Sequence, residues 1–173
     1  MILSLDPGYS KIGWSIISAN GIVQDCGFLN PLEEIPKSMQ FNQKMNLQIR
    51  RLVPIFNDLL DRVSHVAWEI VPSFGAMAQR DLVQSTAMTL KVLTISRNYA
   101  YQSFTPQSWH KEFIGKGKCT KQEVKEQVIN VLKLNNVSVD ENLPFDVFDA
   151  IAIGMVAQKR NEWTYGEWDP KGT

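Results

Sequence analysis

The chain has 173 residues, a length typical of a single domain that buries roughly two-thirds of its unfolded surface. Its 18 basic and 18 acidic residues cancel and 44% of its residues are hydrophobic, which excludes a disordered chain and argues against a nucleic-acid binder unless its charges are segregated. With only two cysteines, no zinc-type Cys/His cluster, no signal peptide and no apolar run of membrane-spanning length, the sequence predicts a cytoplasmic protein with reduced thiols.

The first segment predicts a buried strand that ends in a carboxylate. Residues 2–5 form an almost wholly apolar run, which stops at Asp6 before a Pro-Gly turn. Open sheets place their chemistry at the carboxyl ends of strands, so Asp6 is a candidate site residue; the alternative is that it only starts the turn. Residues 12–18 and 21–29 are predicted as a second and a third strand, joined by a hairpin.

The middle of the chain alternates between helical and strand patterns. Residues 39–63 show the three-to-four spacing of an amphipathic helix, which Pro54 should kink or split. Residues 65–71 predict a strand with Glu69 in its middle. Residues 76–98 predict a second long helix with two apolar stripes, and the second stripe is either additional core or a homodimer interface.

The remaining pattern predicts a strand at 101–105, a short helix at 106–113, a flexible basic loop at 115–118, and helices at 120–134 and 145–159. The tail, 161–173, has no assignable structure, and no domain boundary is visible within 1–160. The order of elements predicts an α/β fold in which helices pack on a mixed sheet.

Glu69 and two further carboxylates occupy apolar surroundings. Burying the charge of Glu69 would cost several kcal/mol without a compensating cation, so it either faces solvent, pairs with a distant cation, or binds metal. Asp146 and Asp149 share one face of the last helix, where acidic residues are often only dipole partners. An apolar stretch, 150–156, follows and places Asp149 at the edge of the core.

Four carboxylates without zinc-type ligands favour hard divalent cations such as Mg²⁺ or Mn²⁺. A pair of such ions about 4 Å apart can activate water and stabilise the leaving oxygen in phosphodiester hydrolysis.

Four segments resemble the RuvC family of Holliday-junction resolvases, within the ribonuclease H-like fold. They are residues 2–8 (ILSLDPG) together with Gly13, residues 66–69 (VAWE), residues 121–125 (KQEVK) and residues 145–154 (FDVFDAIAIG). With the order of elements, the resemblance covers about residues 1–158. It implies a mixed five-stranded sheet, three antiparallel strands followed by parallel ones, with helices on both faces.

The resemblance also implies a site and partners. Asp6, Glu69, Asp146 and Asp149 would bind two Mg²⁺ or Mn²⁺ ions, and Lys121 would lie near the scissile phosphate. The enzyme would be a homodimer, paired through the helix at about 76–98, that nicks two strands of a four-way junction symmetrically and leaves 5′-phosphate ends. The residues that would contact DNA are Phe74 as a wedge, Arg80, His110, Lys111, Lys116, Lys118 and Lys121.

The basic residues are segregated, which answers the objection from neutral charge: five lysines and two glutamates lie within 110–125. The family's second lysine falls on His110, with Lys111 beside it, and Pro72 stands where the family has its aromatic wedge. These departures suggest a divergent member from a bacterial cell, with a phage genome as one source. The rival hypotheses are a ribonuclease H-like enzyme acting on RNA or RNA–DNA hybrids, a branched-DNA-binding protein without catalysis and, least consistent with the length, an ATP-binding actin-like fold.

Overall fold

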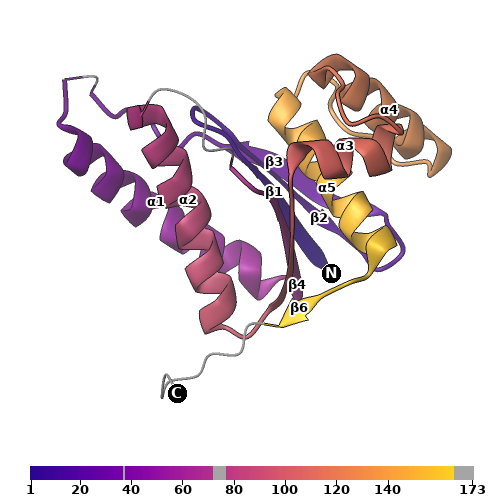
Figure 1. The fold of residues 1–173 in the computed structure, drawn as a ribbon, viewed down its shortest axis with the longest axis horizontal. Helices are drawn as coiled ribbons and strands as arrows, with labels where there is room; N and C mark the ends of the chain where they lie inside the picture. The colour runs from indigo at the N-terminus through magenta and orange to yellow at the C-terminus, as the bar shows by residue number, and fades with distance from the viewer. Residues whose placement is uncertain (37, 72–76, 166–173) are drawn as a thin grey trace.

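One mixed sheet organises the part of the chain that the computed structural model describes, residues 1–36, 38–71 and 77–165 (Figure 1). The strands are β1 (Ile2–Pro7), β2 (Ile12–Ile17), β3 (Val23–Leu29), β4 (His65–Glu69), β5 (Ala100–Phe104) and β6 (Thr164–Tyr165). The helices are α1 (Phe41–Asp61), α2 (Met77–Ser96), α3 (Pro106–Ile114), α4 (Lys121–Leu134) and α5 (Phe145–Arg160).

The strand order, β3-β2-β1-β4-β5-β6, puts β1 inside the sheet. β1 pairs antiparallel with β2 and parallel with β4, and every residue of β1 is buried, which explains its apolar run. Leu5 is paired with Trp68 in the parallel register. Asp6 and Glu69, which follow these two residues, therefore lie at the same end of the sheet.

Helices cover both faces of the sheet and form two cores (Figure 1). On one face, α1 and α2 contribute Leu52, Phe56 and Leu90, which pack with the β1 residues Leu3 and Leu5. On the other face, α5 packs directly on the sheet and is buried along almost its whole length, and α3 and α4 pack against α5. The predicted α/β fold, with three antiparallel strands followed by parallel ones and helices on both faces, is confirmed.

Two glycines let α5 lie directly on the sheet. A Cβ atom on Gly13 of β2 would lie 1.8 Å from the backbone oxygen of Asp146, so only glycine allows this approach. A Cβ atom on Gly154 would lie 2.5 Å from Ser4 Oγ. Gly13 is also the partner of Asp6 in the β1–β2 register, so the first turn of α5 lies beside the end of β1.

Three predictions about the elements need correction. The sheet has a sixth strand in addition to the predicted five, because Thr164 and Tyr165, in the tail that the sequence leaves unassigned, form β6 antiparallel to β5. β4 ends at Glu69, which is therefore the last residue of the strand rather than its middle, and Ile70 beyond it is 43% exposed. α1 continues through Pro54 as a single helix, so Pro54 does not split it.

The uninterrupted α1 has a physical explanation. A proline inside a helix costs about 3 kcal/mol. Leu52, Phe56 and Leu59 around Pro54 are buried, and each buried side chain of this size contributes roughly 1.5–3 kcal/mol. Their packing outweighs the lost hydrogen bond. None of the described helices combines the length and apolar character needed to cross a bilayer.

Candidate metal centre

Asp6 lies where the central strand meets the start of α5. Its side chain is held in place because β1 is paired on both sides and buried throughout, and only 8% of the residue is exposed. A carboxylate at this position is costly unless a cation or hydrogen-bond donors compensate it.

Asp146 and Asp149 face Asp6 from the first two turns of α5. Each of these three residues offers one carboxylate oxygen, and the three oxygens lie within 4.8 Å of one another. The N-cap is Pro144, so both aspartates lie inside the helix rather than at its cap. The predicted convergence of Asp6, Asp146 and Asp149 is therefore present, with the geometry of a shared cation site.

Lys121 places its ammonium among these three carboxylates. Its Nζ atom is 2.5 Å from Asp146 Oδ1, 3.1 Å from Asp149 Oδ2 and 3.9 Å from Asp6 Oδ2. Lys121 is the first residue of α4, which begins with a capping box between Thr120 and Glu123. This capped helix start fixes the backbone of Lys121, while 53% of its side chain remains exposed.

Glu69 joins the site from the end of β4. Its Oε2 atom accepts a 2.7 Å hydrogen bond from the indole Nε1 of Trp109 in α3. Its negative charge acts on Asp6, although Glu69 does not belong to the group of three oxygens within 4.8 Å. Sequence reasoning does not single out Trp109, because the two partners are 40 residues apart and only the fold brings them together.

The electrostatics of the four carboxylates show that they are crowded. Burial raises the pKa of Asp6 well above its ordinary value, and the charges of Glu69 and Asp149 raise it further. Burial also raises the pKa of Asp149, against the opposing effect of Lys121. Burial raises the pKa of Glu69 to about 7, and the Trp109 hydrogen bond opposes that shift.

Lys121 shows the reciprocal effect. Burial would lower its pKa, but the charges of Asp149, Asp146 and Asp6 raise the pKa above its ordinary value. One ammonium thus faces four carboxylates, and a site with this excess of negative charge favours additional cations.

The donor set fits a hard divalent cation. All the candidate ligands are carboxylate oxygens, which Mg²⁺ and Mn²⁺ prefer. The Oδ1 atom of Asp149 is buried and has no hydrogen-bond partner among the described residues, so this oxygen is free to bind a cation. Asp6, Asp146 and Asp149 would bind one ion directly, and Glu69, whose charge acts on Asp6, would be a further ligand.

The residues predicted to contact DNA have different positions. Lys111, Lys116 and Lys118 are exposed around the loop between α3 and α4, and Lys116 forms an ion pair with Glu123. The His110 ring makes an edge contact with the Trp109 ring, with centroids 4.0 Å apart. Phe74 lies outside the described residues, as does the side chain of Arg80.

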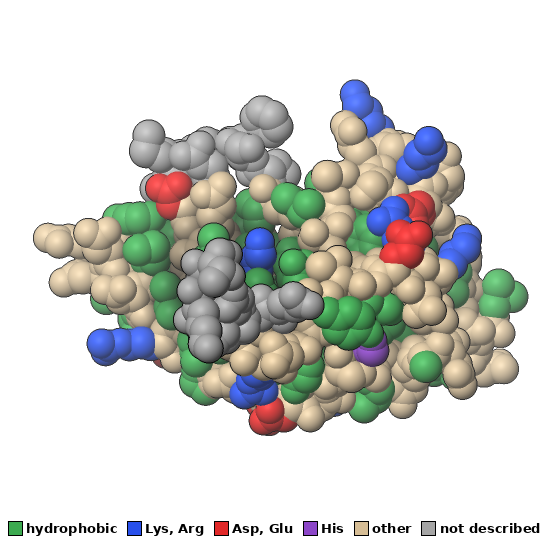
Figure 2. Space-filling view, turned by 60° about the horizontal axis from the view of Figure 1, so that its bottom comes forward, with side chains coloured by type: hydrophobic (Ala, Val, Ile, Leu, Met, Phe, Trp, Pro, Cys, Tyr) green, Lys and Arg blue, Asp and Glu red, His purple; other side chains and the backbone are tan. Residues whose placement is uncertain are grey.

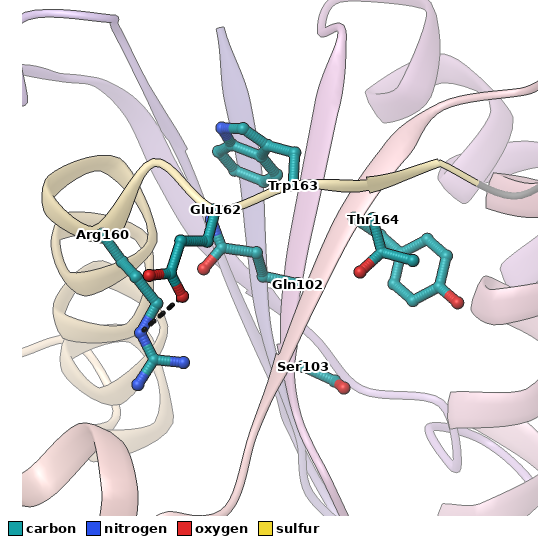
Figure 3. Close-up of a pocket in the computed structure, with 7 residues that line it drawn as sticks. Gln102, Ser103, Arg160, Glu162, Trp163 and Thr164 are labelled. Carbon is teal, nitrogen blue, oxygen red and sulfur yellow. Dashed lines mark ion pairs between the residues drawn. The ribbon is translucent and has the colours of Figure 1, made fainter.

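A separate cavity of about 370 Å³ lies beside β5 and the end of α5 (Figure 3). Its charges are already compensated, since Arg160 forms ion pairs with both Glu112 and Glu162. Gln102 in its wall donates a hydrogen bond to the backbone oxygen of Ala157.

Figure 2, which brings the bottom of Figure 1 forward, shows a face where charges of both signs are scattered among other side chains. The three-aspartate cluster is the stronger candidate for chemistry.

Comparisons with known proteins agree on one family. The family model described as "Crossover junction endodeoxyribonuclease RuvC" matches residues 2–157. Relatives with that name from Helicobacter pylori (strain G27) and Prochlorococcus marinus (strain MIT 9312) are 30% identical over 168 residues and 28% identical over 169 residues. These alignments cover 92% and 93% of this chain, and 96% of each relative.

Solved structures show the same fold. The Thermus thermophilus RuvC structure matches with a TM-score of 0.67 and 15% identity. The structure of T. thermophilus RuvC in complex with Holliday junction substrate matches with a TM-score of 0.68 and 12% identity. Both matches cover 95% of this chain and 98% of the other. The yeast mitochondrial Holliday junction resolvase matches with a TM-score of 0.62 and 20% identity, covering 91% of this chain and 77% of its own. With a family model that spans nearly the whole sequence, this chain belongs to the RuvC family of crossover junction endodeoxyribonucleases.

Proposed function

We propose that this protein resolves Holliday junctions and related branched DNA by divalent-metal-dependent hydrolysis of two phosphodiester bonds. The observation that carries the proposal is the cluster of Asp6, Asp146 and Asp149 at the carboxyl end of the central strand, with Glu69 beside it. Membership of the RuvC family supports junction DNA as the substrate. The bacterial origin of the relatives supports the cytoplasm of a bacterial cell as its location.

The four carboxylates would hold two Mg²⁺ ions, with Mn²⁺ as a substitute. When bound, the ions would activate water and stabilise the leaving oxygen of the phosphodiester. The chain's own contribution is to fix four oxygen ligands on two strand ends and one helix, so that little reorganisation is needed when DNA binds. Hydrolysis would leave 5′-phosphate ends at paired, symmetric nicks.

Lys121 would contact the scissile phosphate. Its Nζ atom lies among the carboxylates, yet half of its side chain is exposed, so it borders both the cluster and the solvent from which DNA arrives. Lys111 near the end of α3, and Lys116 and Lys118 in the α3–α4 loop, would follow the phosphate backbone without reading sequence, with Lys116 exchanging its ion pair with Glu123 for a phosphate. His110, Arg80 and Phe74 complete the proposed DNA contacts.

Symmetric nicking of a four-way junction requires two active sites, and α2 offers a surface on which a second copy can dock. Met88 and Val92, one turn apart on α2, are 60% and 56% exposed. Apolar side chains at this spacing form a stripe that an identical stripe on a two-fold-related copy can cover. We propose that the homodimer forms through this face.

The experiment that tests the proposal is cleavage of a labelled four-way junction in Mg²⁺, Mn²⁺, Ca²⁺ and EDTA, with nicks mapped on every strand. We expect paired nicks in Mg²⁺ and Mn²⁺ and intact junction in EDTA. An equal rate on a plain RNA–DNA hybrid would favour a ribonuclease H-like activity instead, and binding without cleavage in any metal would favour a non-catalytic junction-binding protein.

The matched variants are Asp146→Asn in the cluster and Asp58→Asn on α1. Asp146→Asn should abolish cleavage and leave junction affinity largely intact, since it removes a metal ligand rather than a phosphate contact. Asp58 is exposed on a helix that covers the other face of the sheet, so Asp58→Asn should cleave like the unmodified protein.

A further inference from the structure

Trp109 contacts a carboxylate of the proposed metal centre without being a candidate metal ligand itself. We propose that Trp109 is a positioning residue that holds Glu69 in its metal-binding orientation through the indole N–H, an inference that rests on the proposed metal-dependent function. The hydrogen bond between Trp109 Nε1 and Glu69 Oε2 is 2.7 Å long and joins α3 to the end of β4.

The donor itself cannot move easily. Trp109 is 1% exposed, and its ring packs into the core that α3 and α5 form on the sheet. The His110 ring lies against its edge. A large ring enclosed in a close-packed core has one rotamer, so the direction of its N–H bond is fixed by the fold.

The backbone places α3 at the same end of the sheet as Glu69. In the β4–β5 register Glu69 is paired with Phe104, the last residue of β5, and Ile70 N donates to Phe104 O at 2.7 Å. α3 begins two residues later, with Thr105 as its N-cap and Pro106 at its first position. Trp109 therefore lies in the first turn of α3, next to the ends of β5 and of its neighbour β4, which carries Glu69.

This geometry suits a supporting hydrogen bond to a metal ligand. The N–H occupies one acceptor position on Oε2 and leaves Oε1 for a cation. It also restricts a flexible glutamate side chain that would otherwise lose rotamer freedom when it binds metal. Donors that support metal ligands in this way typically change metal affinity or activity by about 10- to 100-fold when they are removed.

The test is a calorimetric titration of the full chain with Ca²⁺, in the absence of DNA, comparing Trp109→Phe with the unmodified protein. We expect Trp109→Phe to weaken Ca²⁺ binding by about 10- to 100-fold. Trp68→Phe is the matched control. Trp68 is a second buried tryptophan, but it lies in β4, belongs to the core on the opposite face of the sheet and stacks on Tyr101. Its affinity should match that of the unmodified protein.

A double-mutant cycle separates positioning from general damage to the core. If Trp109 acts through Glu69, Trp109→Phe should cause no further loss of affinity in a Glu69→Gln background. Equal losses in both backgrounds, or Ca²⁺ binding by Trp109→Phe as tight as that of the unmodified protein, would overturn the inference but not the proposed function. Absence of divalent-cation binding by the unmodified protein would overturn both.

A second measurement needs no substitution at Trp109, and so it applies even if Trp109→Phe does not fold. In the ¹⁵N-labelled protein, the assigned indole N–H resonance of Trp109 should shift during a Ca²⁺ titration with the same midpoint as the calorimetric titration. An indole resonance that does not move while the cluster binds Ca²⁺ would contradict the proposal.

Discussion

Individual side chains at the carboxyl ends of β1 and β4 explain why this region favours a bound cation. Asp6, Glu69 and Asp149 all have raised pKa values, and burial is the largest cause in each case. Lys121 compensates part of this cost. The same crowding that disfavours the ionised carboxylates without metal provides the binding free energy for a divalent cation.

The raised pKa of Glu69 predicts how the metal-free protein responds to pH. Its pKa rises from 4.5 to about 7 on folding, so between these values the native state holds more protons than the unfolded state. Stability in EDTA should therefore fall as pH rises from 4.5 to 7, and Asp6 and Asp149 should add to the trend. Thermal unfolding followed by circular dichroism would measure it; Glu69→Gln should flatten the dependence, and an identical slope in both proteins would contradict this assignment.

Lys121→Ala should slow cleavage more than it weakens junction binding. The ammonium lies within 3.1 Å of two carboxylates of the cluster, so we expect it to act at the reacting phosphate rather than through general attraction of DNA. Loss of one such electrostatic group commonly costs about 100-fold in turnover. Single-turnover rates and junction affinities would be compared with those of Lys133→Ala, at the other end of α4. Unchanged turnover in Lys121→Ala would exclude the lysine from the site.

At the scale of elements, the placement of α5 on the sheet decides whether the cluster exists. Gly13→Ala would put a methyl group 1.8 Å from the backbone oxygen of Asp146, so α5 must shift. We expect a loss of at least about 1–3 kcal/mol in unfolding free energy, together with loss of cleavage. Gly117→Ala is the control for stability, because its nearest neighbour would be 3.6 Å away. Equal stability of the two variants in urea unfolding would contradict this account.

Patterns along the chain predicted the elements that carry the site because each has a strong local signal. The apolar run before Asp6 predicts β1, and the Thr120 cap and the apolar stretch after Asp149 predict α4 and α5. These signals are enough to place the carboxylates at the ends of buried elements. Their convergence was predicted from family resemblance as well as from chemistry.

The features that sequence reasoning did not predict depend on tertiary contacts. β4 stops at Glu69 although apolar residues continue beyond it. The end of a strand depends on where its pairing partner ends, here Phe104 of β5, and the pattern within β4 alone does not show this. β6 has only two residues and forms only because β5 offers an edge. The Trp109–Glu69 hydrogen bond joins distant segments, and α1 continues through Pro54 because the surrounding residues are buried.

At the scale of the whole molecule, the proposed reaction needs two active sites on one junction. If α2 forms the dimer interface, Met88→Lys combined with Val92→Lys should convert a dimer into monomers, since it places charges in an apolar contact. Light scattering after gel filtration would report the mass. Leu134→Lys, on the exposed end of α4, should leave the dimer intact. A monomeric unmodified protein would contradict the proposed assembly.

Anomalous diffraction at the manganese edge, from crystals soaked in Mn²⁺, tests directly whether the four carboxylates bind two metal ions. We expect two peaks roughly 4 Å apart, bounded by Asp6, Glu69, Asp146 and Asp149, with the ammonium of Lys121 moved away from the carboxylates. A soaked crystal with no anomalous peak at this cluster, and with Lys121 still bound to Asp146 and Asp149, would contradict this expectation.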